Sequence, residues 1–220
     1  MKILIAGDSM AMGEWNPVWQ GPENQILHKG LEQYLLDEGH DVINESRPGD
    51  SLKKIFLSLQ EHKQIFDYVF VFVVEPNNAI DDDKFWNTEY TYEDYYDRHK
   101  EAIRYFVQCL YTLNIGPIKL IGGSAKCLDE YIKGTDIEIA IPSIIELLIP
   151  NIEQYDMAFS YHLKYIDNKV PANVVDKVYE QAQIFDELFK NTIMYPDGKH
   201  PNREGHYKIY QVLKDKYLHA

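Results

Sequence analysis

Cysteine is scarce in this sequence, which contains only Cys109 and Cys127 among its 220 residues. Two cysteines do not make the disulfide framework of a small secreted domain, and neither has a partner at the spacing of a metal-binding motif. We therefore expect two buried free thiols and no metal site.

Long hydrophobic runs are also missing. Ile3 to Ala6 follow a single lysine and are far too short for the apolar region of a signal peptide. No other run approaches the roughly 20 apolar residues that a membrane-spanning helix needs. We expect a cytoplasmic protein with no membrane span.

Positive charge is in short supply, with 22 Lys and Arg against 35 Asp and Glu and a formal net charge of −13. This charge repels nucleic acid and anionic lipid, so neither is an expected partner. A small neutral or cationic substrate fits better. The hydrophobic content of 45% is ordinary for a globular protein, and the length suits a single domain over residues 1–220. These features leave the oligomeric state undetermined.

Hydrophobic patterning predicts strands that alternate with helices. The run at 68–74 is continuously apolar, as in a strand at the centre of a parallel sheet, and apolar residues recur at helical spacing between such runs. The alternation indicates an α/β fold with a doubly wound parallel sheet. The expected strands are 2–6, 41–45, 68–74 and 117–121, and the expected helices are 24–38, 52–59, 99–111 and one that closes the chain.

The stretch from 125 to 171 is less regular. Residues 142–148 predict a short helix, and 155–166 are the candidate for a fifth strand. Helical periodicity returns at 174–189.

The first expected strand ends in Gly7-Asp8-Ser9-Met10. Ligands of open parallel sheets bind beyond the carboxyl ends of the strands, and the small Gly7 lets the chain turn sharply there. A helix that starts after Ser9 would favour negative charge at its N-terminus, so Ser9 is a candidate nucleophile. In isolation, a helix cap after a strand is the simpler interpretation.

Two further strand ends supply hydrogen-bond donors. Gly49 follows the second expected strand and Asn77 follows the third. With the amide of Ser9, the Gly49 amide and the Asn77 side chain form a candidate oxyanion hole. Each residue alone is more typical of a turn.

An aspartate and a histidine stand three residues apart before the closing helix. Asp197 can bond Nδ1 of His200 and leave Nε2 to take a proton from a serine. Pro201 is expected at the first position of the helix. The alternative is a helix cap with a surface histidine. His206 is expected to pack or to face solvent, not to act as the base.

These four blocks, in this order over residues 7–206, resemble the SGNH hydrolase (GDSL-like) family. The resemblance implies Ser9 as nucleophile, His200 as base oriented by Asp197, and an oxyanion hole of Ser9, Gly49 and Asn77. It also implies a three-layer, flavodoxin-like sheet of about five strands in the order 2-1-3-4-5. Ester hydrolysis through an acyl-enzyme, without a cofactor, is the implied activity.

The third block departs from the family pattern. Glu75-Pro76-Asn77-Asn78 stands where the family has Gly-x-Asn-Asp. Glu75 either points into the pocket, where it reads a substrate hydroxyl or amine, or pairs with a basic group such as Arg47, which we favour.

The expected substrate contacts surround these blocks. Aromatic residues crowd 79–98 directly after the third block, and flat rings suit the apolar faces of sugars. We expect lid-like insertions at about 79–98 and 129–170, although aromatics that merely pack an insertion fit equally well. The candidate contact residues are Asp8, Met10, Trp15, Glu75, Asn78 and Trp86.

The sequence thus predicts a serine esterase that removes a small acyl group, such as acetyl, from a carbohydrate. An acyltransferase or a lipid esterase would use the same residues. An inactive glycan-binding domain of the same fold also stays open. A nucleotide-binding flavodoxin-like protein is disfavoured, because no glycine-rich phosphate loop follows the first strand.

Overall fold

The structure is a computed structural model that describes residues 1–15, 26–73, 92–123, 126–149 and 200–219. A five-stranded sheet at its centre has the order β4-β1-β5-β6-β7, and all four pairings are parallel. Counted along the chain, these strands have the order 2-1-3-4-5, as expected. They are β1 (Lys2–Ala6), β4 (Asp41–Asn44), β5 (Tyr68–Val73), β6 (Ile118–Gly122) and β7 (Glu138–Ile141).

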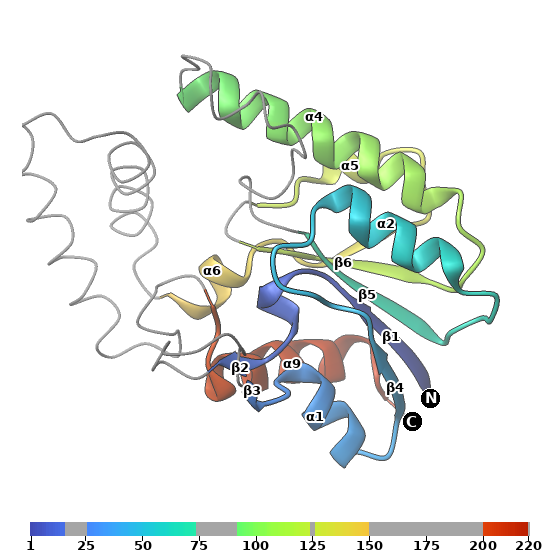
Figure 1. Ribbon diagram of the computed structural model, residues 1–220, viewed down its shortest axis with the longest axis vertical. Coiled ribbons are helices and arrows are strands. Elements are labelled where there is room, and N and C mark those ends of the chain that lie inside the picture. Colours follow the sequence, from blue (N-terminus) through green and yellow to red (C-terminus); the bar gives the residue numbers. More distant parts are fainter. Residues whose placement is uncertain (16–25, 74–91, 124–125, 150–199, 220) are drawn as a thin grey trace, which may run out of the picture.

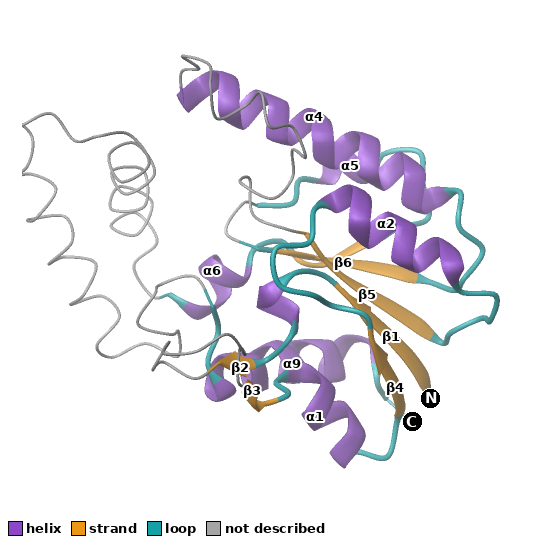
Figure 2. Ribbon diagram, viewed as in Figure 1, coloured by secondary structure: helices purple, strands orange, loops and turns teal. Residues whose placement is uncertain are grey.

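Helices cover both faces of the sheet and complete a three-layer α/β/α fold (Figures 1 and 2). One face carries α1 (Leu31–Asp37), α6 (Ile144–Leu148) and α9 (Arg203–Tyr217). The other face carries α2 (Leu52–Glu61), α4 (Tyr92–Tyr111) and α5 (Asp129–Ile132).

Strand β1 shows why a strand at the centre of this sheet is mostly apolar. Ile3 and Ile5 pack into the cluster with α1, α6 and α9, whereas Leu4 and Ala6 pack into the cluster with α2, α4 and α5. All four side chains are buried. Successive side chains of a strand point to opposite faces, so a strand covered on both faces buries consecutive residues and favours apolar ones.

The segment before α1 differs from its prediction. The helix expected over 24–38 begins only at Leu31, and Ile26–His28 forms β3, which pairs antiparallel with β2 (Glu14–Trp15). Ile26 and Leu27 are 36% and 50% exposed, so they are not part of a buried helix face. The prediction was wrong here because Ile26 and Leu27 continue the helical spacing of apolar residues without being buried in the core.

The region after β6 also needs correction. The fifth strand is Glu138–Ile141, and the candidate at 155–166 lies outside the described residues. Residues 129–149 form α5, β7 and α6 of the main fold, so this part of the expected insertion at 129–170 is no insertion. The short helix expected at 142–148 is present as α6. The expected helix at 174–189 and most of the other insertion, 79–91, lie outside the described residues.

The cysteines are free in the structure. Cys127 is buried, and this burial raises the pKa of its thiol to about 12, whereas Cys109 is half-buried. Within the described ranges, no group of histidine, cysteine and acidic residues has the arrangement of a metal site. No helix in the same ranges has the length and apolar character needed to cross a membrane.

Candidate active site

The nucleophile candidate lies at the carboxyl end of β1, in a short 3₁₀ helix, η1 (Ser9–Ala11). Asp8 caps this helix, because its Oδ1 accepts a hydrogen bond from the amide of Met10 at 3.0 Å. The capping role considered for this tripeptide therefore belongs to Asp8, not to Ser9. A Cβ at Gly7 would lie 2.8 Å from Cβ of Phe72, so glycine allows the turn to pass close to β5.

The loop between β4 and α2 lies against the same turn. The amide of Arg47 donates to the carbonyl oxygen of Gly7 at 3.2 Å, and the amide of Asp50 donates to the carbonyl oxygen of Arg47 at 3.3 Å. Gly49 is exposed in this turn with φ of +69°, a conformation that favours glycine. The candidate oxyanion donor Gly49 thus belongs to a loop that is hydrogen-bonded to Gly7, two residues before Ser9.

His200 meets Ser9 at this edge of the sheet. Nε2 of His200 lies 2.7 Å from Oγ of Ser9, although 191 residues separate the two in sequence. Helix α9 starts three residues after His200, and Asn202 caps it by accepting a hydrogen bond from the amide of Gly205 at 3.0 Å. The sequence predicts Pro201 at the first helical position. In the structure Pro201 precedes the cap Asn202, and the first helical residue is Arg203.

This contact has the geometry of a nucleophile and its general base. A neutral imidazole whose Nε2 carries a lone pair accepts the hydroxyl proton of serine at such a distance. The other tautomer would donate from Nε2 to Oγ instead, so the role of base requires the proton on Nδ1. A hydrogen-bond acceptor at Nδ1 would select the first tautomer.

The other predicted site residues fall into two groups. Asp8 and Met10 are each 1% exposed, Asp8 as the cap of η1 and Met10 within the core cluster of β1, which leaves little of either side chain for a substrate. Trp15 belongs to β2, and its side chain is not described. Five residues lie outside the described part of the chain: Glu75, Asn77, Asn78, Trp86 and Asp197.

Asn44 supports the nucleophile turn and was not singled out from the sequence. Its Nδ2 donates to the carbonyl oxygen of Ala11 at 3.3 Å, and its Oδ1 accepts from the amide of Ser46 at 3.0 Å. The side chain thereby ties η1 to the end of β4. An asparagine at the end of the strand, at the ligand-binding edge of the sheet, was the available signal.

His206 lies in the first turn of α9 and is completely buried. The pKa of its imidazole is lowered to about 3, mainly by desolvation and also by Coulomb repulsion from His28 and His200, while the Gly13 backbone opposes the shift. Of the two expected positions, packed or facing solvent, the structure shows the packed one. It is neutral in the folded protein at physiological pH.

This burial predicts a loss of stability in acid. Between pH 6.5, the ordinary pKa, and pH 3, the unfolded chain binds a proton at His206 that the folded chain does not, so the free energy of unfolding falls as the pH falls. From pH 7 to pH 5, we expect a contribution of about 2 kcal/mol to this fall. Urea unfolding of wild type and His206→Phe at both pH values measures it. Equal pH dependence in the two proteins would contradict the prediction.

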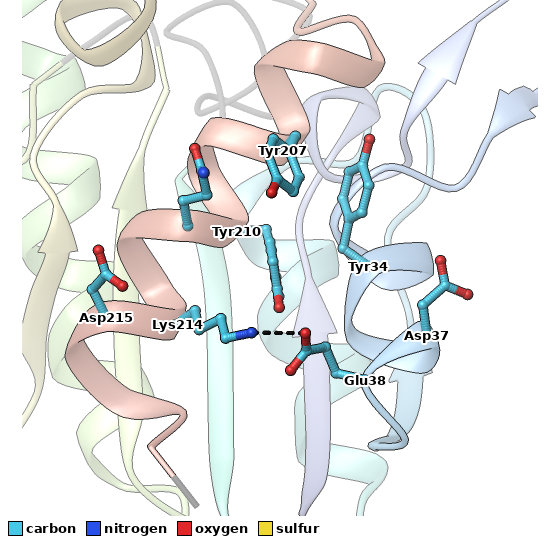
Figure 3. A pocket seen from close by; sticks show the side chains of 8 residues that line it. Tyr34, Asp37, Glu38, Tyr207, Tyr210, Lys214 and Asp215 are labelled. Carbon is cyan, nitrogen blue, oxygen red and sulfur yellow. Dashed lines mark hydrogen bonds and ion pairs between the residues drawn. The ribbon is translucent and has the colours of Figure 1, made fainter.

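A pocket of about 520 Å³ lies between α1 and α9 (Figure 3). Tyr34 and Tyr207 line its upper end in this view, and Lys214 pairs with Glu38 across its floor at 2.7 Å. None of the predicted site residues lines it. The pocket is therefore separate from the contact between Ser9 and His200.

Comparison with known proteins gives structural likenesses only. No protein-family model matches the chain, and no curated protein does. Axe2, an acetylxylan esterase from Geobacillus stearothermophilus, matches with 18% identity over 100% of this chain and 94% of its own, with a TM-score of 0.44. A G-D-S-L family lipolytic protein from Veillonella parvula matches with 13% identity over 100% and 99%, with a TM-score of 0.46.

A third solved structure, TesA, matches with 16% identity over 98% of this chain and 97% of its own, with a TM-score of 0.43. These likenesses are too distant to decide a function. The order of the sequence blocks, the strand order and the contact between Ser9 and His200 all belong to this chain itself. In these three respects the chain resembles the SGNH hydrolases.

Proposed function

We propose that this protein is a serine esterase in which Ser9 is the nucleophile and His200 the general base. The distance of 2.7 Å between Oγ of Ser9 and Nε2 of His200 is the observation that carries the proposal. A serine and a histidine 191 positions apart have no local reason to meet. Neither side chain caps a helix, because Asp8 and Asn202 have those roles.

The proposed reaction has two steps. In the first, Oγ of Ser9 attacks the ester carbonyl while Nε2 of His200 takes the hydroxyl proton. The tetrahedral intermediate collapses when His200 gives this proton to the leaving alcohol, and an acyl-enzyme is left. In the second, His200 removes a proton from water, which attacks the acyl carbonyl. The bond from the acyl carbon to Oγ of Ser9 then breaks as His200 returns the proton to Oγ, and the acid is released.

Three further residues complete the proposed machinery. Asp197 would accept a hydrogen bond from Nδ1–H of His200 and so hold the tautomer whose Nε2 is unprotonated. The amides of Ser9 and Gly49, with the side chain of Asn77, would stabilise the oxyanion. The bond from the Arg47 amide to the Gly7 carbonyl supports the part of Gly49, because it ties the Gly49 loop to the nucleophile turn.

The substrate we propose is a carbohydrate that carries a small acyl group such as acetyl. The net charge of −13 disfavours anionic acyl donors, whereas an acetylated sugar is neutral. The aromatic residues of 79–98 that would contact a sugar face follow Asn77 closely in sequence.

Hydrolysis of p-nitrophenyl esters of increasing chain length tests the proposal. We expect turnover that is fastest with acetate, release of acetate from acetylated oligosaccharides, and fluorophosphonate labelling that maps to the peptide containing Ser9. Preference for long acyl chains would favour a lipid esterase. Absence of both turnover and labelling would refute the esterase and favour a glycan-binding domain.

A further inference from the structure

The imidazole of His206 lies directly against a glycine backbone. A Cβ at Gly30 would be 2.6 Å from Cγ and 2.7 Å from Nδ1 of His206. Neither ring nitrogen has a hydrogen-bond partner of regular geometry among the described residues, although the Gly13 backbone is near enough to favour the charged form. The ring is therefore held mainly by its close packing.

A second glycine, Gly13, lies against Gly30. The Cβ at Gly30 would also be 2.8 Å from Cα of Gly13, and a Cβ at Gly13 would be 2.2 Å from the carbonyl oxygen of His28. Gly13 and Gly30 have φ of +116° and +56°, where other residues are strained. We call Gly13, Gly30 and His206 the glycine–imidazole cradle.

The cradle joins the two chain segments that carry the proposed site. Gly13 comes four residues after Ser9 and directly follows the turn that continues from η1. His206 comes six residues after His200, in the first turn of α9. A shift of α9 relative to η1 would have to open the contact of the His206 ring with Gly30 or the contact of Gly30 with Gly13.

Two polar contacts reinforce the same junction. Arg203, the first residue of α9, binds Glu14 through Nε at 3.1 Å and through Nη2 at 3.0 Å. The hydroxyl of Tyr34 donates to the carbonyl oxygen of Arg203 at 3.1 Å. Both contacts hold the start of α9 against the β2–β3 hairpin and α1.

We propose that His206 is a positioning residue, which through the cradle fixes His200 at bonding distance from Ser9. The inference rests on the proposed function, since it assigns His206 a part in the same site. Displacement of a reacting group by about 1 Å can cost roughly 100-fold in rate, so a rigid junction between the two segments bears directly on catalysis. Close-packed contacts transmit such constraints because they leave no slack.

The neutral state of the His206 ring is compatible with a positioning role close to His200. His200 becomes an imidazolium when it takes the serine proton, and a second positive charge nearby would oppose that step. Burial keeps His206 uncharged, with its pKa lowered to about 3. It can therefore lie near His200 without repelling the charged intermediate.

The variant Gly30→Ala tests the cradle, with Gly39→Ala as its matched control. These glycines flank α1, and both have positive φ, but a Cβ at Gly39 would meet nothing within 4 Å. We expect Gly30→Ala to lower kcat by about 10- to 100-fold with KM changed by less than about threefold. Gly39→Ala should keep kcat within about twofold of wild type. Equal kcat in the two variants would overturn the proposal.

Removal of the ring gives an independent test. We expect His206→Ala to lower kcat, and Gly30→Ala/His206→Ala to lower it by less than the product of the two single effects, because the added methyl then meets Cα of Gly13 but no longer meets the ring. Leu213→Ala, which truncates another buried side chain of α9, should lose stability and keep kcat in the folded protein. If Gly30→Ala does not fold, unequal kcat of His206→Ala and Leu213→Ala supports the proposal, and equal kcat overturns it.

NMR of the His200 ring separates failure of this inference from failure of the esterase proposal. In wild type we expect one sharp set of ring signals, and in His206→Ala broadened or doubled signals, whether or not any ester is hydrolysed. Unchanged His200 signals in His206→Ala would overturn the positioning role. Sharp wild-type signals without ester turnover or labelling would leave the cradle in place and refute only the esterase.

Discussion

Replacement of Ser9 by alanine is expected to lower kcat/KM for p-nitrophenyl acetate by about 10³- to 10⁶-fold. The methyl group cannot form the acyl-enzyme, so the remaining rate comes only from substrate binding and the oxyanion donors. Labelling by a fluorophosphonate should vanish. Substrate binding should change little, because Oγ contributes mainly to the transition state. Steady-state kinetics and intact mass after labelling measure both effects.

Ser46→Ala is the matched control for this substitution. Ser46 is 9% exposed in the loop after β4, and its hydroxyl has no hydrogen-bond partner among the described residues. We expect this variant to keep kcat/KM within about twofold, since no bond is lost. If a fluorophosphonate labelled Ser9→Ala as fast as wild type, another residue would be the nucleophile.

Replacement of His200 by alanine is the second large effect that we expect. Without a base at 2.7 Å, Oγ of Ser9 stays protonated and is a weak nucleophile, so kcat should fall by about 10³-fold or more. Fluorophosphonate labelling should slow by a comparable factor without vanishing, because Ser9 is still present. The double variant Ser9→Ala/His200→Ala should be no slower than Ser9→Ala, since the two residues act as a unit.

His40→Gln serves as the control for a lost imidazole. His40 lies just before β4, at the amino end of the parallel strands, whereas Ser9 follows the carboxyl end of β1. Its kcat should equal that of wild type. Wild-type turnover by His200→Ala would remove His200 from the mechanism and leave its contact with Ser9 a structural one.

Much of the fold could be predicted from the sequence, because buried parallel strands are recognisable from their apolar residues. Apolar runs placed β1 and β5, and shorter apolar stretches placed β4 and β6, to within one residue at each described end. The pattern missed β7 (Glu138–Ile141), because it indicated 155–166 as the candidate for the fifth strand. It was misleading at Ile26–His28, where exposed apolar residues continued the helical spacing of α1.

The supports of the site were hidden from sequence for a different reason. Asn44 acts through a backbone carbonyl 33 residues away, and Gly30 through a ring 176 residues away, so no local pattern reveals either. His206 was expected to pack or to face solvent, and its burial decided between the two.

By itself, the sequence determined the layered α/β architecture, its strand order by resemblance, and the identity of the proposed chemical groups. Periodicity and the order of the motifs can be read along the chain without knowing which segments meet in space. Only the tertiary structure decided that Nε2 of His200 lies 2.7 Å from Oγ of Ser9 and that Asp8, not Ser9, caps η1. It also decided that His206 fits against two glycines, because such contacts exist only once the sheet has brought distant segments together.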